Sequence, residues 1–352
     1  MKLNHIYKSI ACGVLLAMTA TSCDLDYNPV DTYSDVTEGV NKTDEKPIFN
    51  SVQDVETSMV TLHKKFRDQQ EHWYVDKLLI GDAHSDNAYA GTTGAEVVPY
   101  ETNSIEGSNS VLKRDWDRFL GDIAVANRII VGCDQLKALS ESERGKYQSQ
   151  AKIFRAMVMF DMVRLWGNFP VITTVGGDIT EDNVEEMYPT YFPPQNTAEE
   201  AYAQIEKDLT EAVENPNTPT NDTSDKSILT KSVARAMLAK VYAEKPLRDY
   251  AKVIKYADEL AADGFDLVED FSDLWAYDTE KKDCRVRNTK EAILEAHFPP
   301  GSGNWCTWMF GRNLSNWDES FTWAKWITPS RDLIRLYEEQ GDTKRYNESV
   351  VW

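Results

Sequence analysis

The amino-acid sequence predicts a mainly α-helical protein with long irregular loops and little β-structure. Apolar residues recur at intervals of three and four along several segments, which is the spacing of one face of an α-helix. Ser/Thr-x-x-Glu patterns at Ser140–Glu143 and Thr197–Glu200 mark two helix starts. We therefore expect one domain of paired helices that resemble tetratricopeptide hairpins, although no strict repeat of about 34 residues is present.

The first two helices are indicated by their apolar stripes. One stripe begins at Val52, directly after Ser51, and the other begins at Leu112. In both, the steps alternate between three and four residues, so each stripe faces one side of a helix. The stripes consist of Val52, Val55, Met59, Leu62 and Phe66, and of Leu112, Trp116, Phe119, Ile123, Ala126 and Ile130.

The third helix has the clearest limits. Ser140 and Glu143 form a capping box at its start, and Gly167 with Pro170 beyond it marks its end. Its apolar stripe consists of Tyr147, Ala151, Phe154, Val158, Met162 and Leu165, and Met157, Phe160 and Trp166 add a second flank. We expect this helix to be buried on most of its sides.

Three charged residues of this helix then need partners, because an unpaired buried charge is costly. They are Arg155, Asp161 and Arg164. Asp161 and Arg164 lie one turn apart and could pair with each other. Structural ion pairs are the commoner reason for such residues, so a catalytic role is not favoured.

The later elements follow the same logic. Thr230 caps a further helix, and a turn at Pro246 leads to its partner, whose apolar face is expected to hold Tyr250, Val253, Ala257 and Leu260. The stretch EAILEAHF, from Glu291 to Phe298, is the best strand candidate. Ser330 and its two predecessors open a last helix over 331–340.

The N-terminus is typical of a secretory signal. Two lysines precede an apolar run from Ile10 to Ala20, which is too short to span a bilayer. The small residues of ATSC, which end at Cys23, resemble a bacterial lipobox, in which the cysteine is acylated. We expect residues 1–22 to be a lipoprotein signal peptide and residues 23–352 to be a helical domain. The alternative is an ordinary signal peptide and a secreted protein.

Charge and motifs exclude several functions. The formal net charge is −20, from 38 basic and 58 acidic residues, which opposes binding to nucleic acid. Three cysteines remain beyond Cys23, namely Cys133, Cys284 and Cys306; one bridge, such as Cys284 with Cys306, stays open. The sequence contains no phosphate-loop, dinucleotide, hydrolase-elbow or zinc-protease motif, so we expect no enzymatic activity, no cofactor and no metal.

A tryptophan-rich segment, Asn304 to Trp326, holds five of the ten tryptophans of the chain. Their spacing fits neither a helix nor a strand, and glycines and asparagines among them favour a winding surface segment. Two interpretations stay open: a loop that fills a gap in the core, or an exposed aromatic platform. Trp323 and Trp326 lie close to the last helix, where packing is the preferred interpretation.

Several stretches together resemble the SusD and RagB family, the surface glycan-binding lipoproteins of Bacteroidetes. The resemblance depends above all on AKIFRAMVMFDMVRLWGNFPVITT, Ala151 to Thr174, and also on CDLDYNPVDTYSD and WDRFLGDIAVANRII. It implies a right-handed stack of tetratricopeptide-like hairpins that binds an oligosaccharide. It also implies a lipid anchor in the outer membrane and a TonB-dependent transporter, the SusC partner. Family members usually continue further, so we expect this chain to lack the usual C-terminal part.

The resemblance favours the aromatic platform, because sugars stack on aromatic rings and bind nearby amides and carboxylates. A second expected contribution is a loop from Glu71 to Gly91. In it Asp82 and His84 alternate with an acidic residue like metal ligands, but a solvated turn is preferred. The candidate glycan contacts are Asn304, Trp305, Trp308 and Trp317, together with Trp73, Asp86, Asn87 and Tyr89. The alternatives are a peptide-binding lid of a peptide importer and, less favoured, a glycoside hydrolase.

Overall fold

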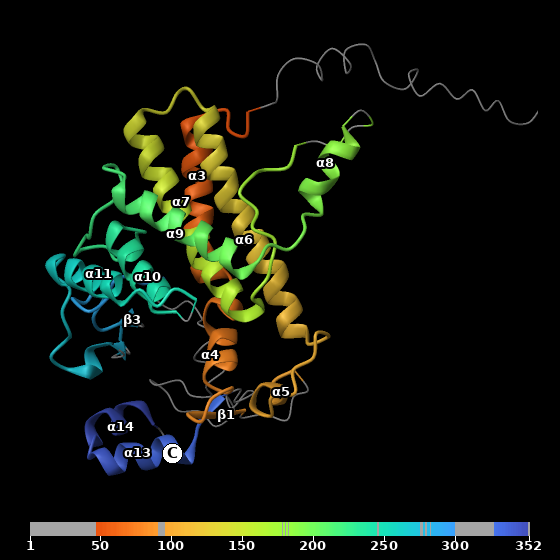
Figure 1. Cartoon of the computed structure of the whole chain (residues 1–352). Helices are drawn as coiled ribbons and strands as arrows, with labels where there is room; N and C mark the ends of the chain where they lie inside the picture. The colour runs from red at the N-terminus through yellow and green to blue at the C-terminus, as the bar shows by residue number, and fades with distance from the viewer. Residues whose placement is uncertain are drawn as a thin grey trace, which may run out of the picture. The chain divides into compact units, whose positions relative to one another are not determined.

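The computed structural model describes residues 47–350 apart from 91–95, 178, 180, 182, 245, 275–276, 279, 282 and 300–326. Most of the regular structure in these residues is helical (Figure 1). The helices are α3 (Val52–Asp68), the π-helical turn η2 (Glu71–Val75), α4 (Asp76–Gly81), α5 (Val98–Glu101), α6 (Ser110–Gln135), α7 (Glu141–Trp166), α8 (Val184–Tyr191), α9 (Ala198–Glu214), α10 (Lys231–Ala243), α11 (Tyr250–Ala262), the 3₁₀ turn η3 (Phe271–Leu274), α13 (Arg331–Gln340) and α14 (Thr343–Ser349). The strands are β1 (Ala88–Ala90), β2 (Tyr277–Asp278), β3 (Asp283–Cys284) and β4 (Ile327–Pro329).

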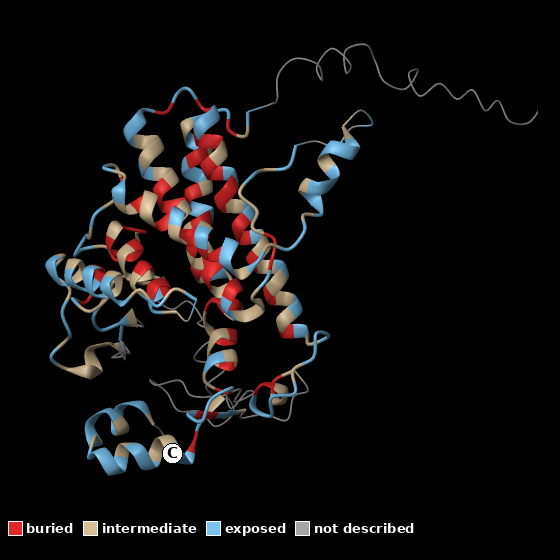
Figure 2. Cartoon of the chain, viewed as in Figure 1, coloured by how far each residue is buried: buried red, intermediate tan, exposed pale blue. Residues whose placement is uncertain are grey.

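The predicted mainly α fold is confirmed. Helices α6 and α7 pack together, α7 packs on α9, and α10 packs on both α9 and α11, so neighbouring helices form hairpins. The buried residues of Figure 2 gather on the long helices at the centre of this arrangement. Within the described residues, no helix is both long enough and apolar enough to cross a membrane.

The predicted starts of α3 and α7 are confirmed by their caps. Ser51 accepts a hydrogen bond from the backbone of Asp54 and so caps α3. Ser140 and Glu143 bond to each other's backbone N–H groups at the start of α7. Helix α7 ends at Gly167, whose φ of 71° suits glycine because a Cβ atom would be strained there.

The predicted partners for the charged residues of α7 are confirmed, but Asp161 and Arg164, which could have paired with each other, pair with other residues. Arg155 is 3% exposed and donates two hydrogen bonds to Asp208 of α9, of 2.7 and 2.8 Å, and one of 2.7 Å to Asn127. Asp161 pairs with Lys77 at 2.5 Å, whereas Arg164 pairs with Glu244 at 3.2 Å. The two side chains contact different neighbours, so tertiary packing decides their pairing.

The face of α11 differs from the expectation. Tyr256 is the buried residue of this helix, whereas Tyr250 is 59% exposed and Ala257 is also exposed. The ring of Tyr256 stacks on that of Tyr242 in α10, with centroids 6.0 Å apart and planes at 1°. Val253 of the expected face packs against the main core and Leu260 is partly buried, so the buried face includes part of the predicted stripe together with Tyr256.

The predicted strand over Glu291–Phe298 is wrong, because this stretch is irregular. Its apolar residues Ile293 and Leu294 pack against the main core, and the backbone N–H of Glu295 donates to Lys226 O at 2.8 Å. The last predicted helix is confirmed as α13, capped by Ser330, and α14 follows it.

Candidate functional site

The predicted contacts lie in two segments of the chain. Those of the tryptophan-rich segment, together with Trp323 and Trp326, lie outside the described residues, as does Cys23. They therefore stay predictions. The members concerned are Asn304, Trp305, Trp308 and Trp317.

The second segment is not the loop that the sequence suggested. Residues 71–81 form η2 and α4, and residues 88–90 form β1. Val75 and Leu79 are buried there, and the buried ring of His72 lies 2.9 Å from a carboxylate oxygen of Asp122, so apolar packing and a polar contact hold these short helices against the rest of the molecule. The exposed residues in the described part of the segment are Gly81, 84–87 and Tyr89.

The structure corrects the assignment of Trp73, which lies in the core and is 4% exposed. Its ring centroid lies 4.7 Å from that of Phe66 and 5.5 Å from that of Phe154. The amine of Lys77 sits 4.7 Å from the centroid of the same ring. A sugar cannot stack on a ring whose faces are occupied in this way, so Trp73 is a packing residue.

Asp86, Asn87 and Tyr89 are exposed beside a strand pair that joins distant parts of the chain. Strand β1 pairs antiparallel with β4, with Tyr89 opposite Thr328. Ser330 continues the contact: its backbone N–H donates to Asn87 O at 2.9 Å, and its hydroxyl donates to Asp86 O at 2.6 Å. We call Asp86–Ala90 with Ile327–Ser330 the β1–β4 platform.

The platform joins the two candidate segments. The tryptophan-rich segment rejoins the described chain at Ile327, which is the strand partner of Ala90. About 240 residues separate the two strands, so no local pattern could predict that they pair. Tyr89 is 40% exposed, and Asp86 and Asn87, three and two positions earlier in the chain, are exposed as well.

A small apolar cluster supports the platform. Ala90 and Ile327 pack against it, and the backbone N–H of Ala90 donates to Glu101 Oε2 at 2.7 Å. Such a cluster is required because two strands of three residues are not stable in isolation. Its buried members are Leu79, Ala83, Val97, Tyr100 and Val111.

An acid pair borders this cluster. Asp76 is fully buried and forms an ion pair with Arg114, and Asp115 is 1% exposed. Burial and, after it, the neighbouring Asp76 together raise the pKa of the Asp115 carboxyl to about 9, against the opposing effects of Arg114 and Arg118. Asp115 is therefore protonated at neutral pH, and hydrogen bonding between its side chain and Asp76 contributes to the raised pKa. Burial also raises the pKa of Tyr100.

Sequence reasoning missed a second exposed aromatic surface, on and beside α8. None of the eight residues of this helix is buried. The signal was present in the stretch MYPTYFPP, where aromatic residues alternate with prolines and threonine. Large apolar side chains exposed here are Ile179, Val184, Tyr188, Tyr191 and Phe192.

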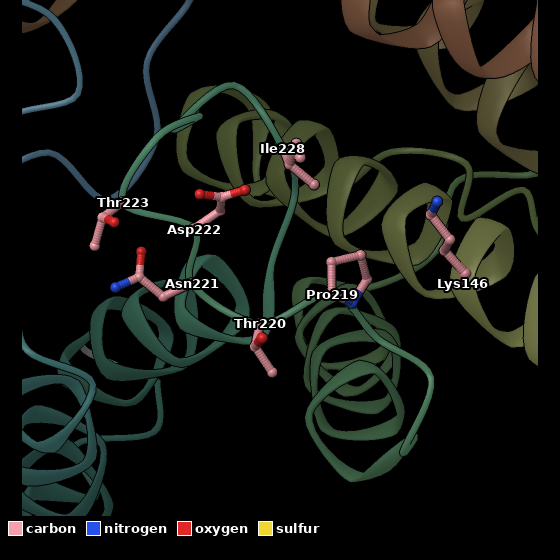
Figure 3. A pocket seen from close by; sticks show the side chains of 7 residues that line it. All are labelled: Lys146, Pro219, Thr220, Asn221, Asp222, Thr223 and Ile228. Carbon is pink, nitrogen blue, oxygen red and sulfur yellow. The ribbon is translucent and has the colours of Figure 1, made fainter.

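Two of the hollows in the described part of the chain bear on ligand binding. One, of about 420 Å³, is lined by Lys146, Ile228 and the loop 219–223 (Figure 3). Asp222 and Asn221 of that loop bond to Ser224 and to the backbone of Asp263, so their polar groups maintain the loop itself. The other hollow is a groove of about 230 Å³ between α6 and α8.

In the described part of the chain, Asp82, His84 and Asp86 do not form a cluster of metal ligands. The Nε2 atom of His84 is hydrogen-bonded to Asn103, so this nitrogen is not turned towards a metal site with Asp82 and Asp86. Among the residues that the structure describes, no three His, Cys, Asp or Glu side chains lie together as metal ligands. Cys284 is exposed and Cys133 is buried, and Cys306 is outside the described residues.

Comparison with known proteins gives consistent matches. A family model described as SusD-like, starch-binding and associating with the outer membrane, matches residues 32–243. A SusD-like protein of Bacteroides ovatus is 25% identical over 309 residues, which cover 84% of this chain and 50% of the relative. The chain thus spans about half the length of this curated relative.

Solved structures share the fold. A SusD superfamily protein from Bacteroides thetaiotaomicron aligns with a TM-score of 0.64 at 18% identity, covering 82% of this chain and 62% of that one. Surface glycan-binding protein A from Bacteroides fluxus aligns at 0.58 and 20% identity, covering 73% and 52%. A laminarin binding SusD-like protein aligns at 0.53 and 20% identity, covering 64% and 48%. At these identities the likeness concerns the fold alone.

Proposed function

Because the chain belongs to the SusD-like family of starch-binding proteins that associate with the outer membrane, we propose that it binds an oligosaccharide or polysaccharide at the cell surface. It does so without hydrolysing the glycan. Surface glycan-binding protein A from Bacteroides fluxus and the laminarin binding SusD-like protein share its fold and support this proposal.

One observation carries the proposal. The β1–β4 platform presents an aromatic ring, an amide and a carboxylate together, from Tyr89, Asn87 and Asp86, at the point where the tryptophan-rich segment rejoins the described chain. Sugar rings offer apolar C–H faces to aromatic side chains and hydroxyls to amides and carboxylates. The platform has both kinds of group on adjacent positions.

The cellular part of the proposal follows from the leader and the family. Acylation of Cys23 would hold the protein on the outer membrane, since two or more acyl chains anchor stably where one chain binds reversibly. A TonB-dependent transporter of the SusC type would then receive the glycan for uptake. Residues 1–22 would be removed as the signal peptide, and residues 23–352 would form the surface domain.

The test measures binding of the chain, with Cys23→Ala to keep it soluble, to a panel of polysaccharides that includes soluble starch and laminarin. Tyr89→Ala is expected to weaken binding by about 1 kcal/mol, because roughly 40 Å² of stacked ring at about 25 cal/mol per Å² is lost. Asn87→Ala is expected to remove a hydrogen bond of similar worth. Stability should stay unchanged, since both side chains are exposed.

Two results would redirect the proposal. Tight binding of peptides with no binding of any polysaccharide would assign the platform to a peptide importer. Shortened glycan products after long incubation, which disappear on replacing one Asp or Glu, would place the protein among the enzymes.

A further inference from the structure

Helix α8 exposes an aromatic face. A surface helix normally buries an apolar stripe, but no residue of α8 is buried. Val184, Tyr188 and Phe192 follow one another at intervals of four and are 43%, 59% and 66% exposed. Exposed apolar side chains gathered in this way mark a binding surface more often than a chance arrangement.

The aromatic face is held in place. The hydroxyl of Tyr191 donates to Gly177 O at 2.6 Å, and its ring packs so closely on Gly176 that an added Cβ atom would lie 3.1 Å from it. The rings of Tyr188 and Phe192 stack with centroids 4.7 Å apart and planes at 30°. A surface fixed before binding loses little side-chain entropy when a ligand arrives.

The groove between α6 and α8 begins beside Tyr191. Its wall on the α6 side is fixed by Asn127, which is 1% exposed and donates to the carbonyl oxygens of Ile172 and Thr174 at 2.9 and 3.2 Å. The lining combines apolar side chains with hydroxyls and the guanidinium of Arg128. At about 230 Å³ it is smaller than the roughly 300–1,000 Å³ of pockets for drug-sized ligands, so it suits one ring of a longer chain.

We propose that the Tyr188–Phe192 pair and this groove form a second contact surface for a neutral oligosaccharide, separate from the β1–β4 platform. The inference depends on the proposed glycan binding and extends it. A groove for one ring beside a stacked aromatic pair allows consecutive units of one chain to bind at both places. Two contacts on one glycan chain raise its overall affinity through effective concentration.

Charge favours a neutral glycan over other ligands. Glu181, Glu185 and Glu186 are exposed on or next to α8 and outnumber Arg128 of the groove, so anionic polysaccharides and anionic lipid surfaces would be repelled. The same glutamates argue against a protein partner, because interface cores are depleted of charge and need about 800 Å² on each side. An uncharged sugar stacks on the rings without desolvating these carboxylates.

The test measures affinity for soluble starch, laminarin and polygalacturonate in the Cys23→Ala chain. Tyr188→Ala and Phe192→Ala are each expected to weaken binding of the neutral glycan by roughly three- to tenfold, through loss of a stacked ring face. Ala124→Phe, which fills the groove from an exposed position of α6, is expected to act likewise. Tyr250→Ala is the matched control, because Tyr250 is as exposed as Tyr188 but lies on α11.

The outcomes separate this inference from the proposed function. If the parent chain binds starch or laminarin and the α8 variants bind equally well, the second surface is wrong and the proposed function stands. If the parent chain binds no neutral polysaccharide, both are wrong. Tighter binding of polygalacturonate than of the neutral glycans would also overturn the inference. So would α8 variants that bind glycan normally but no longer bind the transporter partner.

Discussion

Replacing Asp115 by Asn tests the acid pair beneath the β1–β4 platform. The pKa of the buried Asp115 carboxyl is raised to about 9, against about 3.9 in an unfolded chain, so folding takes up a proton at neutral pH. The folded-state pKa of Asp115 lies above the unfolded one. The contribution of Asp115 to the free energy of unfolding is therefore complete below about pH 4 and falls as the pH rises towards 9. The loss is about 1.4 kcal/mol per pH unit, or about 4 kcal/mol by pH 7.

The Asp115→Asn variant removes this dependence, because an amide is neutral at every pH and still offers an N–H donor to Asp76. Urea unfolding followed by circular dichroism between pH 5 and pH 8 measures both slopes. We expect the variant to be more stable than the parent chain at pH 7, with a gap that widens as the pH rises. The matched control is Asp117→Asn, which makes the same change on the same helix at a side chain that is 62% exposed.

Parallel stability curves for the parent chain and Asp115→Asn would refute the reasoning, since they would mean that Asp115 is ionised in the folded state. A destabilised variant at pH 5, where the parent carboxyl is already protonated, would instead show that the amide does not replace the hydrogen bond to Asp76.

Three further predictions concern the buried ion pair of the core, the lipid anchor at Cys23 and the tryptophan-rich segment. Asp208→Ala leaves Arg155 buried without its carboxylate and should cost about 3–5 kcal/mol by urea unfolding; Glu211→Ala, whose partner Lys152 is more exposed, should cost less than about 1 kcal/mol. Cys23→Ala should release the protein from the membrane fraction, and a variant that stays there contradicts the lipid anchor. Alanine at one of three tryptophans should weaken glycan binding by about 1–2 kcal/mol without changing the melting temperature; a loss of stability of about 3–5 kcal/mol would favour a core plug. Those tryptophans are Trp305, Trp308 and Trp317.

Local patterns predicted the helices well because their causes are local. Caps such as Ser140 with Glu143 involve residues three apart, and an apolar stripe records which face of one helix is buried. The same patterns could not choose partners across the fold. Asp161 lies one turn from Arg164, yet it bonds to Lys77, about eighty residues earlier in the chain.

The candidate site was predicted less well, for the same reason. Tryptophan in a polar stretch suggested exposure, whereas Trp73 fills a space between Phe66 and Phe154 that only the packed helices create. The pairing of Tyr89 with Thr328 has no sequence signal, because a three-residue strand is too short to show alternation. The sequence suggested that Asn87 lies at the surface, and the structure places it there. The sequence did not indicate that Asn87 lies beside Ser330.

The short strands explain why the platform depends on the groups beneath it. Strands β1 and β4 exchange few hydrogen bonds, so the apolar cluster around Leu79 and Tyr100 must supply much of their stability. Tyr100 belongs to that cluster and interacts electrostatically with Asp115 and Asp76. A second charge at Asp115 would therefore act on the cluster that positions Tyr89, and glycan affinity at high pH should fall together with stability. In Asp115→Asn both should persist, which connects the acid pair to binding without placing it in contact with the sugar.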